Sequence, residues 1–150
     1  MAVATVLWSG PCLEADEPST TARTASQREP AQSGAISSEE FISSPFADFF
    51  KSGEYARALD ALDALAEQHP DDPLIIRYRA IVLDRLGRYD EALALYEELL
   101  ASDPTHVPTR FFRAQTYYEK GDRDNAIKEM QWVVDKSPSK EYRLWAQEYL

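Results

Sequence analysis

The chain has 150 residues, enough for one domain with a tail, and its 44% hydrophobic and 28% charged content is that of an ordinary globular protein. A formal net charge of −10 repels phosphate backbones, so the composition disfavours nucleic-acid binding. No apolar run is long enough for a membrane-spanning helix, and the single cysteine, Cys12, excludes an intrachain disulfide.

Residues 1–38 are predicted to be a disordered leader or linker. Residues 1–8 are mildly apolar but contain no Lys or Arg, and residues 10–38 consist largely of Pro, Ser, Thr, Glu, Gln and Ala. Such a stretch cannot bury enough apolar surface to offset the entropy lost on ordering. Residues 9–12 are weakly similar to a lipoprotein cleavage site, so a signal or lipid anchor is the alternative, although Pro11 fits that site poorly.

Three glycines, Gly53, Gly87 and Gly121, lie 34 residues apart, and the same residue types recur at fixed distances from each. An alanine stands five residues after each glycine, a large apolar residue nine after, and a proline seventeen after. These residues are Ala58, Ala92 and Ala126, then Leu62, Tyr96 and Met130, then Pro70, Pro104 and Pro138. A register kept over three copies indicates a tandem repeat.

Each repeat is predicted to be a helical hairpin. Segments such as 74–86 and 89–102 are rich in helix-forming residues and carry apolar side chains at three- and four-residue spacing. The glycine between the two segments permits a sharp turn, and the recurring proline ends the second helix. One such hairpin cannot cover its own apolar faces, whereas stacked copies can.

Two Pro-containing dipeptides mark helix starts. Asp72-Pro73 is expected to supply an N-cap and a first-turn proline for the next helix, and Ser44-Pro45 is expected to do the same in the first repeat. A proline inside a helix costs about 3 kcal/mol. The first helix of that repeat is therefore predicted to start near Pro45, with residues 39–44 irregular or forming a separate turn.

These features resemble the tetratricopeptide-repeat (TPR) family, whose hallmark is a 34-residue helix–turn–helix with this pattern of small, large and proline positions. The resemblance implies an all-α fold, a right-handed superhelical solenoid of antiparallel helix pairs. It covers residues 39–140 as three repeats, 39–72, 73–106 and 107–140, and residues 141–150 are expected to begin a capping or continuing helix. The sequence departs from the pattern at Arg110, where Trp or a large apolar residue is expected, and at Arg79 and Arg113, where Leu is commoner.

The resemblance also implies a partner-binding surface, because the first helix of each TPR lines a concave groove that holds an extended peptide or a partner helix. The residues predicted to bind the partner are Arg77, Ile81, Asp84, Arg85, Phe111, Gln115, Tyr118, Trp145 and Tyr149. Further groove positions are Ser43, Ala47, Phe50, Lys51, Glu119 and Tyr142. On an acidic protein, Arg77 and Arg85 are expected to form a positive centre that pairs with a partner carboxylate. The alternative is that the aromatic residues belong to the core and that Trp145 and Tyr149 cap the open end.

The TPR subtype that grips the acidic tails of heat-shock chaperones uses a set of Lys, Asn and Arg residues. At the matching positions this chain has Ser43, Ala47, Tyr78, Pro108 and Phe112, so that subtype is not expected.

No catalytic chemistry is predicted. His69 and His106 are expected to be solvated loop residues, because neither has a His or Cys companion at metal-ligand spacing. The serines have no plausible base, and the five glycines are too dispersed to form a phosphate-binding loop. We therefore predict no enzyme activity, metal, cofactor or small-molecule substrate.

Three hypotheses follow for function. The first is a scaffold or adaptor that binds a protein or peptide in the groove. The second is a module of a larger periplasmic or envelope assembly or transport protein, and the third is homo-oligomerisation through the terminal helix. The sequence does not determine the compartment, although the cytoplasm is slightly favoured over a periplasmic or secreted location.

Overall fold

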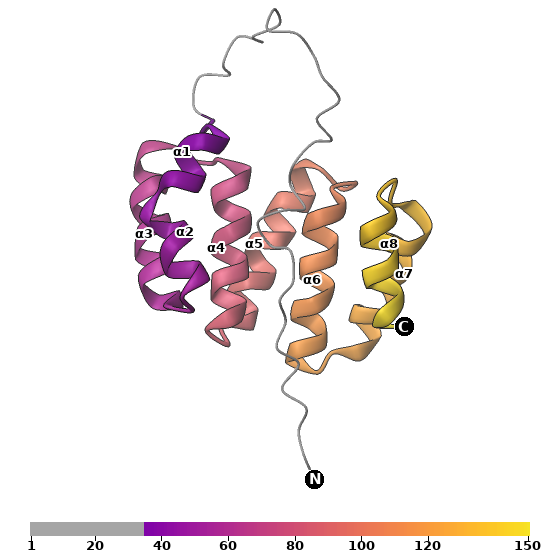
Figure 1. Cartoon of the computed structure of the whole chain (residues 1–150). Helices are drawn as coiled ribbons and strands as arrows, with labels where there is room; N and C mark the ends of the chain where they lie inside the picture. The colour runs from indigo at the N-terminus through magenta and orange to yellow at the C-terminus, as the bar shows by residue number, and fades with distance from the viewer. Residues whose placement is uncertain (1–34) are drawn as a thin grey trace, which may run out of the picture. The chain divides into compact units, whose positions relative to one another are not determined.

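The computed structural model describes residues 35–150, and the regular structure in this part of the chain is helical throughout (Figure 1). The all-α fold predicted from the sequence is confirmed. The helices are α1 (Ser38–Ser43), α2 (Pro45–Lys51), α3 (Tyr55–Gln68), α4 (Pro73–Arg85), α5 (Tyr89–Ser102), α6 (Val107–Lys120), α7 (Arg123–Lys136) and α8 (Lys140–Glu148). Residues 1–34 of the predicted leader lie outside the described residues.

The helices follow one another along the array, and each packs against the next in sequence (Figure 1). Helices α2 and α3, α4 and α5, and α6 and α7 form three hairpins, and α8 continues after the third. In addition, α4 contacts α6, and α6 contacts α8. Helices α4, α6 and α8 therefore lie side by side, and α2 meets α4 where the rings of Phe46 and Tyr78 pack 5.4 Å apart; we call the shared surface of these helices the inner face.

The turn within each hairpin depends on a glycine in the left-handed conformation. Gly87, between α4 and α5, has φ +75°, which a residue with a Cβ rarely adopts. After it, the Arg88 amide donates to the Leu83 carbonyl at 2.9 Å, which closes the end of α4. The equivalent Gly53 and Gly121 also have positive φ, so the 34-residue spacing of glycines in the sequence corresponds to three equivalent turns.

The two predicted helix starts behave differently. Asp72 caps α4, because one carboxylate oxygen accepts hydrogen bonds from the amides of Leu74 (2.8 Å) and Ile75 (3.3 Å). Helix α2 begins at Pro45 as predicted, but the Ser44 side chain does not cap it. Its hydroxyl instead donates to the Phe41 carbonyl at 2.6 Å, because the preceding residues form a helix whose last carbonyls need donors.

Residues 35–38, which the sequence assigns to the leader, belong to the folded part. Ile36 is buried, and its amide donates to the second carboxylate oxygen of Asp72 at 2.9 Å. Residues 38–43 form the short helix α1, which buries Phe41. The Phe41 ring packs against Phe46 and Tyr78, with ring centres 5.1 and 4.9 Å away. Helix α1 is therefore part of the folded core, because its Phe41 ring packs against α2 and α4.

The core follows the repeated pattern. Ala58, Ala92 and Ala126 are buried, so the paired helices approach closely there. Leu62, Tyr96 and Met130, four residues further on, are also fully buried and fill the space beside them. The positions of these six side chains show how stacked hairpins bury apolar faces that one hairpin would leave exposed.

Candidate functional site

Several residues predicted for the groove belong to the core instead. Ile81 and Phe111 are each only 3% exposed, and Phe111 packs against the rings of Tyr142, Trp145 and Tyr149 at 5.4 to 6.3 Å. These contacts lie between α6 and α8, so the aromatic residues of α8 hold it against the third hairpin. These rings therefore pack against one another, in agreement with the alternative that the aromatic residues belong to the core.

Arg77 does not form the exposed positive centre that the sequence suggests. Its side chain is 7% exposed, and its guanidinium lies 3.3 Å from the imidazole Nε2 of His106 at the start of α6. Arg85, the other arginine of the predicted pair, is half-buried. Arg77 is buried because the loop before α6 brings His106 over it, a contact that helical spacing does not reveal.

The other predicted residues meet at one end of the inner face. We call Asp84, Arg85, Gln115, Tyr118, Glu119 and Tyr149 the inner-face cluster; they come from α4, from α6 and from the end of α8. The Gln115 amide donates to the Tyr149 hydroxyl at 2.8 Å, and the rings of Tyr118 and Tyr149 meet edge to face at 5.4 Å. Tyr118 is 39% exposed, and Glu119 is also exposed.

The charges of the cluster interact. Burial raises the pKa of Asp84, while Thr116 and the Arg85 guanidinium partly lower it again and Glu119 raises it. Burial likewise raises the pKa of the Tyr149 hydroxyl, an effect that Gln115 and Arg85 oppose. One carboxylate oxygen of Asp84 is buried without a hydrogen-bond partner, which agrees with the raised pKa of this carboxyl.

The outer edge of the cluster is formed by α7. The Arg123 guanidinium lies 5.3 Å from the centre of the Tyr118 ring, and a small cavity of about 40 Å³ lies between this ring, Tyr149 and the side chains of Ala126 and Met130. Three helices thus fix the orientation of the two tyrosines before any partner binds.

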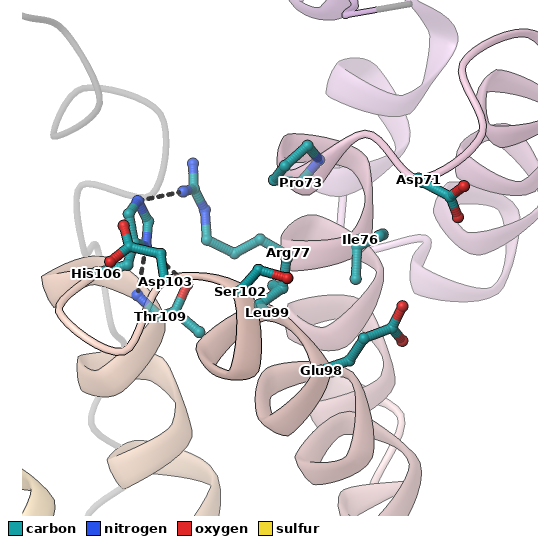
Figure 2. Close-up of a pocket in the computed structure, with 10 residues that line it drawn as sticks. All are labelled: Asp71, Pro73, Ile76, Arg77, Glu98, Leu99, Ser102, Asp103, His106 and Thr109. Atoms are coloured by element: carbon teal, nitrogen blue, oxygen red, sulfur yellow. Dashed lines mark hydrogen bonds between the residues drawn. The ribbon is translucent and has the colours of Figure 1, made fainter.

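A second, larger cavity lies elsewhere and was not predicted. It has a volume of about 280 Å³ and lies between the first half of α4, the end of α5 and the start of α6 (Figure 2). Pro73, Ile76 and Leu99 are its apolar residues, and Arg77 and His106 lie together on another side.

Both histidines depart from the prediction of solvated loop residues. His106 precedes α6 and is partly buried; its Nδ1 lies 2.8 Å from the Thr109 hydroxyl and 3.3 Å from the Thr109 amide. His69 lies 3.2 Å from a Glu40 carboxylate oxygen, with 17% of its side chain exposed. Each histidine thus connects a loop to a helix about 30 residues away in the sequence.

The two arginines that depart from the repeat pattern in the third hairpin share one partner. Arg110 and Arg113 on α6 both donate to the Glu129 carboxylate on α7, Arg110 at 2.9 Å. The Arg110 guanidinium also lies 4.2 Å from the centre of the Trp132 ring. An ionic and cation–π network therefore joins α6 to α7 where large apolar side chains are expected.

Among residues 35–150 no group of three or more His, Cys, Asp or Glu side chains is placed to hold a metal ion. No helix in this part of the chain has both the length and the apolar character needed to cross a membrane.

The tetratricopeptide-repeat family profile matches residues 47–107 and, in a second match, residues 85–144. The chain belongs to the tetratricopeptide-repeat family. The two matches overlap in the second repeat and together cover all three hairpins from α2 onward. The repeat boundaries at 39–72, 73–106 and 107–140 remain a prediction.

Two curated relatives of this TPR chain have similar sequences. It is 30% identical over 73 residues, 49% of the chain and 25% of the relative, to ER membrane protein complex subunit 2-B of Xenopus laevis. It is also 30% identical over 96 residues, 64% of the chain and 15% of the relative, to signal recognition particle subunit SRP72 of Caenorhabditis elegans. The chain thus spans a quarter or less of the length of these relatives.

Solved TPR structures share the fold. The Sgt2 TPR domain from Aspergillus fumigatus superimposes with a TM-score of 0.64 at 17% identity, covering 77% of this chain and 79% of that one. PcrH in complex with the chaperone binding region of PopB gives 0.61 at 19% identity, covering 70% and 88%. The first TPR of Spaghetti (RPAP3) bound to an HSP90 peptide gives 0.58 at 19% identity, covering 69% and 83%. These similarities show that the chain has a TPR fold.

Proposed function

We propose that this TPR chain is a protein-interaction scaffold that binds an extended peptide or a helix of a partner protein against its inner face. The observation that carries the proposal is the inner-face cluster, in which polar and aromatic side chains from α4, α6 and the end of α8 lie close together and are not fully buried. Tyrosine and arginine are the residue types that dominate binding energies at protein interfaces. Two of the solved structures with this fold are themselves complexes with a peptide or a segment of a partner, which supports the proposal.

The cluster contains both donors and acceptors. Arg85 and Gln115 can donate to partner carbonyls or carboxylates, while Asp84 and Glu119 can accept from partner amides or basic side chains. The tyrosine pair offers rigid aromatic surface, which loses little side-chain entropy on binding. A partner main chain that crosses α4, α6 and α8 would therefore meet groups of both kinds.

Two steps test this function on the full chain. A random peptide library displayed on phage is selected against the protein, and the affinity of an enriched peptide is then measured by isothermal titration calorimetry. We expect Tyr118→Ala and Glu119→Lys each to weaken the peptide by about tenfold, because each change costs about 1.4 kcal/mol at a contact of this type. Arg77→Ala is unsuitable as a test, since Arg77 is buried and the change would also affect folding.

Glu97→Lys is the matched control for Glu119→Lys. Glu97 is exposed on α5, outside the inner face, so reversing its charge changes the net charge equally without touching the cluster. Peptide affinity that is unchanged in both cluster variants would refute binding at the inner face.

A further inference from the structure

The cavity in Figure 2 lies apart from the inner-face cluster. It uses the first half of α4, whereas Asp84 and Arg85 lie about two helical turns further along the same helix. Its apolar residues, Ile76 and Leu99 among them, come from both helices of the second hairpin. Any ligand held there contacts a different part of the molecule from a peptide on the cluster.

The third hairpin carries an aromatic ring at a position that corresponds to one of the residues lining the cavity. Positions 76 and 98 in the second hairpin correspond, 34 residues later, to Arg110 and Trp132. In the third hairpin the guanidinium of Arg110 lies against the indole of Trp132, 4.2 Å from the ring centre. In the second hairpin the corresponding Ile76 and Glu98 line the 280 Å³ cavity, and neither has an aromatic ring.

The surroundings of the cavity suit an aromatic ring from outside. Ile76 and Leu99 provide apolar contact, and the Arg77 side chain forms another part of the wall, with its guanidinium turned towards His106. Arg77 is held in place by burial and by its contact with His106, so a ligand would not have to order it.

The rim of the cavity is acidic. Asp71, Glu98 and Asp103 line it and are exposed, and the whole chain carries a net charge of −10. Positive charges beside the aromatic residue are therefore favoured. A second copy of the chain is a poor candidate, because the residues next to Trp8, Trp132 and Trp145 include no Lys or Arg.

We infer that this cavity is a second binding site, which takes a tryptophan side chain flanked by basic residues from a partner protein. The tryptophan occupies the space between Ile76 and Leu99. The basic neighbours pair with Glu98 and Asp71 at the rim.

The test uses three short capped peptides as probes, titrated into the full chain labelled on its Ile and Leu methyl groups. The probes are acetyl-Lys-Trp-Lys-amide, acetyl-Lys-Ala-Lys-amide and acetyl-Glu-Trp-Glu-amide. We expect the Lys-Trp-Lys peptide to shift the NMR signals of the Ile76 and Leu99 methyl groups in a saturable manner. The Lys-Ala-Lys peptide should cause no saturable shift, and the Glu-Trp-Glu peptide should bind at least about threefold more weakly, the size of a rim charge effect.

Glu98→Trp places an indole at the position that corresponds to Trp132, so it should fill the cavity and abolish the shifts caused by Lys-Trp-Lys. Glu97→Trp, one residue away and exposed on the same helix, is the control and should retain them. Glu98→Lys tests the rim charge without filling the cavity. It should weaken the binding of Lys-Trp-Lys by about threefold and strengthen the binding of Glu-Trp-Glu.

Three results would overturn the inference. The first is the absence of saturable shifts at Ile76 and Leu99 up to the solubility limit of Lys-Trp-Lys. The second is a Glu-Trp-Glu affinity equal to that of Lys-Trp-Lys. The third is full binding of Lys-Trp-Lys to a folded Glu98→Trp variant, because the ligand would then lie outside the cavity.

Discussion

At the scale of single residues, burial determines the pKa of a charged side chain and how much its ion pairs contribute to stability. Arg77 and Arg85 differ by two helical turns on α4, yet one is buried against His106 and the other is half-buried beside Asp84. Charge alone therefore does not tell which of the two side chains is exposed.

Asp84 should limit stability at neutral pH. Its pKa is raised by burial, so the folded state binds the proton more tightly than the unfolded state does. Its favourable contribution is thus complete below the unfolded value of about 4 and is lost as the pH rises through the folded value. We expect Asp84→Asn to have a higher Tm than the wild type at pH 7, with a difference that shrinks towards pH 4. Thermal melts followed by circular dichroism would measure it, and a lower Tm at pH 7 would contradict the prediction.

Glu129 should contribute more to stability than Asp63, although both pair with arginine. Glu129 is 15% exposed and binds Arg110 and Arg113, which are also largely buried, whereas the Asp63–Arg79 pair is nearly half exposed. Glu129→Gln leaves two largely buried cations without their counter-charge, and we expect a loss of about 3 kcal/mol. Asp63→Asn should cost less than about 1 kcal/mol. Urea unfolding of both variants gives the comparison, and equal losses would show that burial is not what separates the two sites.

At the scale of elements, the helix ends carry much of the specificity of the fold. Asp72 starts α4 with one carboxylate oxygen and holds the Ile36 amide with the other. A single side chain therefore joins the segment before α1 to the second hairpin.

Asp72→Ala should destabilise the chain by about 1 to 3 kcal/mol, because it removes a helix N-cap and leaves the amide of buried Ile36 without an acceptor. Asp72→Asn separates the two contacts, because its one carbonyl oxygen can still cap α4 whereas its NH2 group cannot accept from the Ile36 amide, so it should cost less than Asp72→Ala. The free energy of unfolding in urea is the measurement. Equal losses for the two variants would contradict a contribution from the cap of α4.

At the scale of the whole molecule, the repeat made the fold and the positions of the inner-face cluster predictable, but not which of the neighbouring side chains are buried. The glycine at 87, the alanine at 92 and a large apolar residue at 96 recur with a 34-residue period, and local helix and turn physics acts in the same way on each copy, so the hairpins followed from the sequence. Phe111 was misplaced because helical spacing gives the direction of a side chain, while its exposure depends on how closely α8 packs over it. The cavity beside Ile76 was missed because it arises from a difference between repeats.

The net charge of −10 should make the folded chain sensitive to ionic strength. Like charges repel more strongly in the compact state, and salt screens that repulsion over about 10 Å at 0.1 M. We expect Tm to rise by a few degrees between low salt and physiological salt, despite weaker ion pairs at the surface. Differential scanning calorimetry in sodium chloride would measure the change. A fall in Tm would mean that attractive pairs such as Arg88–Glu91 outweigh the repulsion.

The placement of the tryptophans has a practical consequence for studying how the array comes apart. Within the described residues, indole rings occur only at Trp132, beneath Arg110 in the third hairpin, and at Trp145, among the rings around Phe111. Changes in their fluorescence report on the C-terminal half, whereas far-ultraviolet dichroism averages over every helix. Denaturation curves from the two signals would coincide if the hairpins unfold together. The curves would have different midpoints if the hairpins unfold one after another from one end.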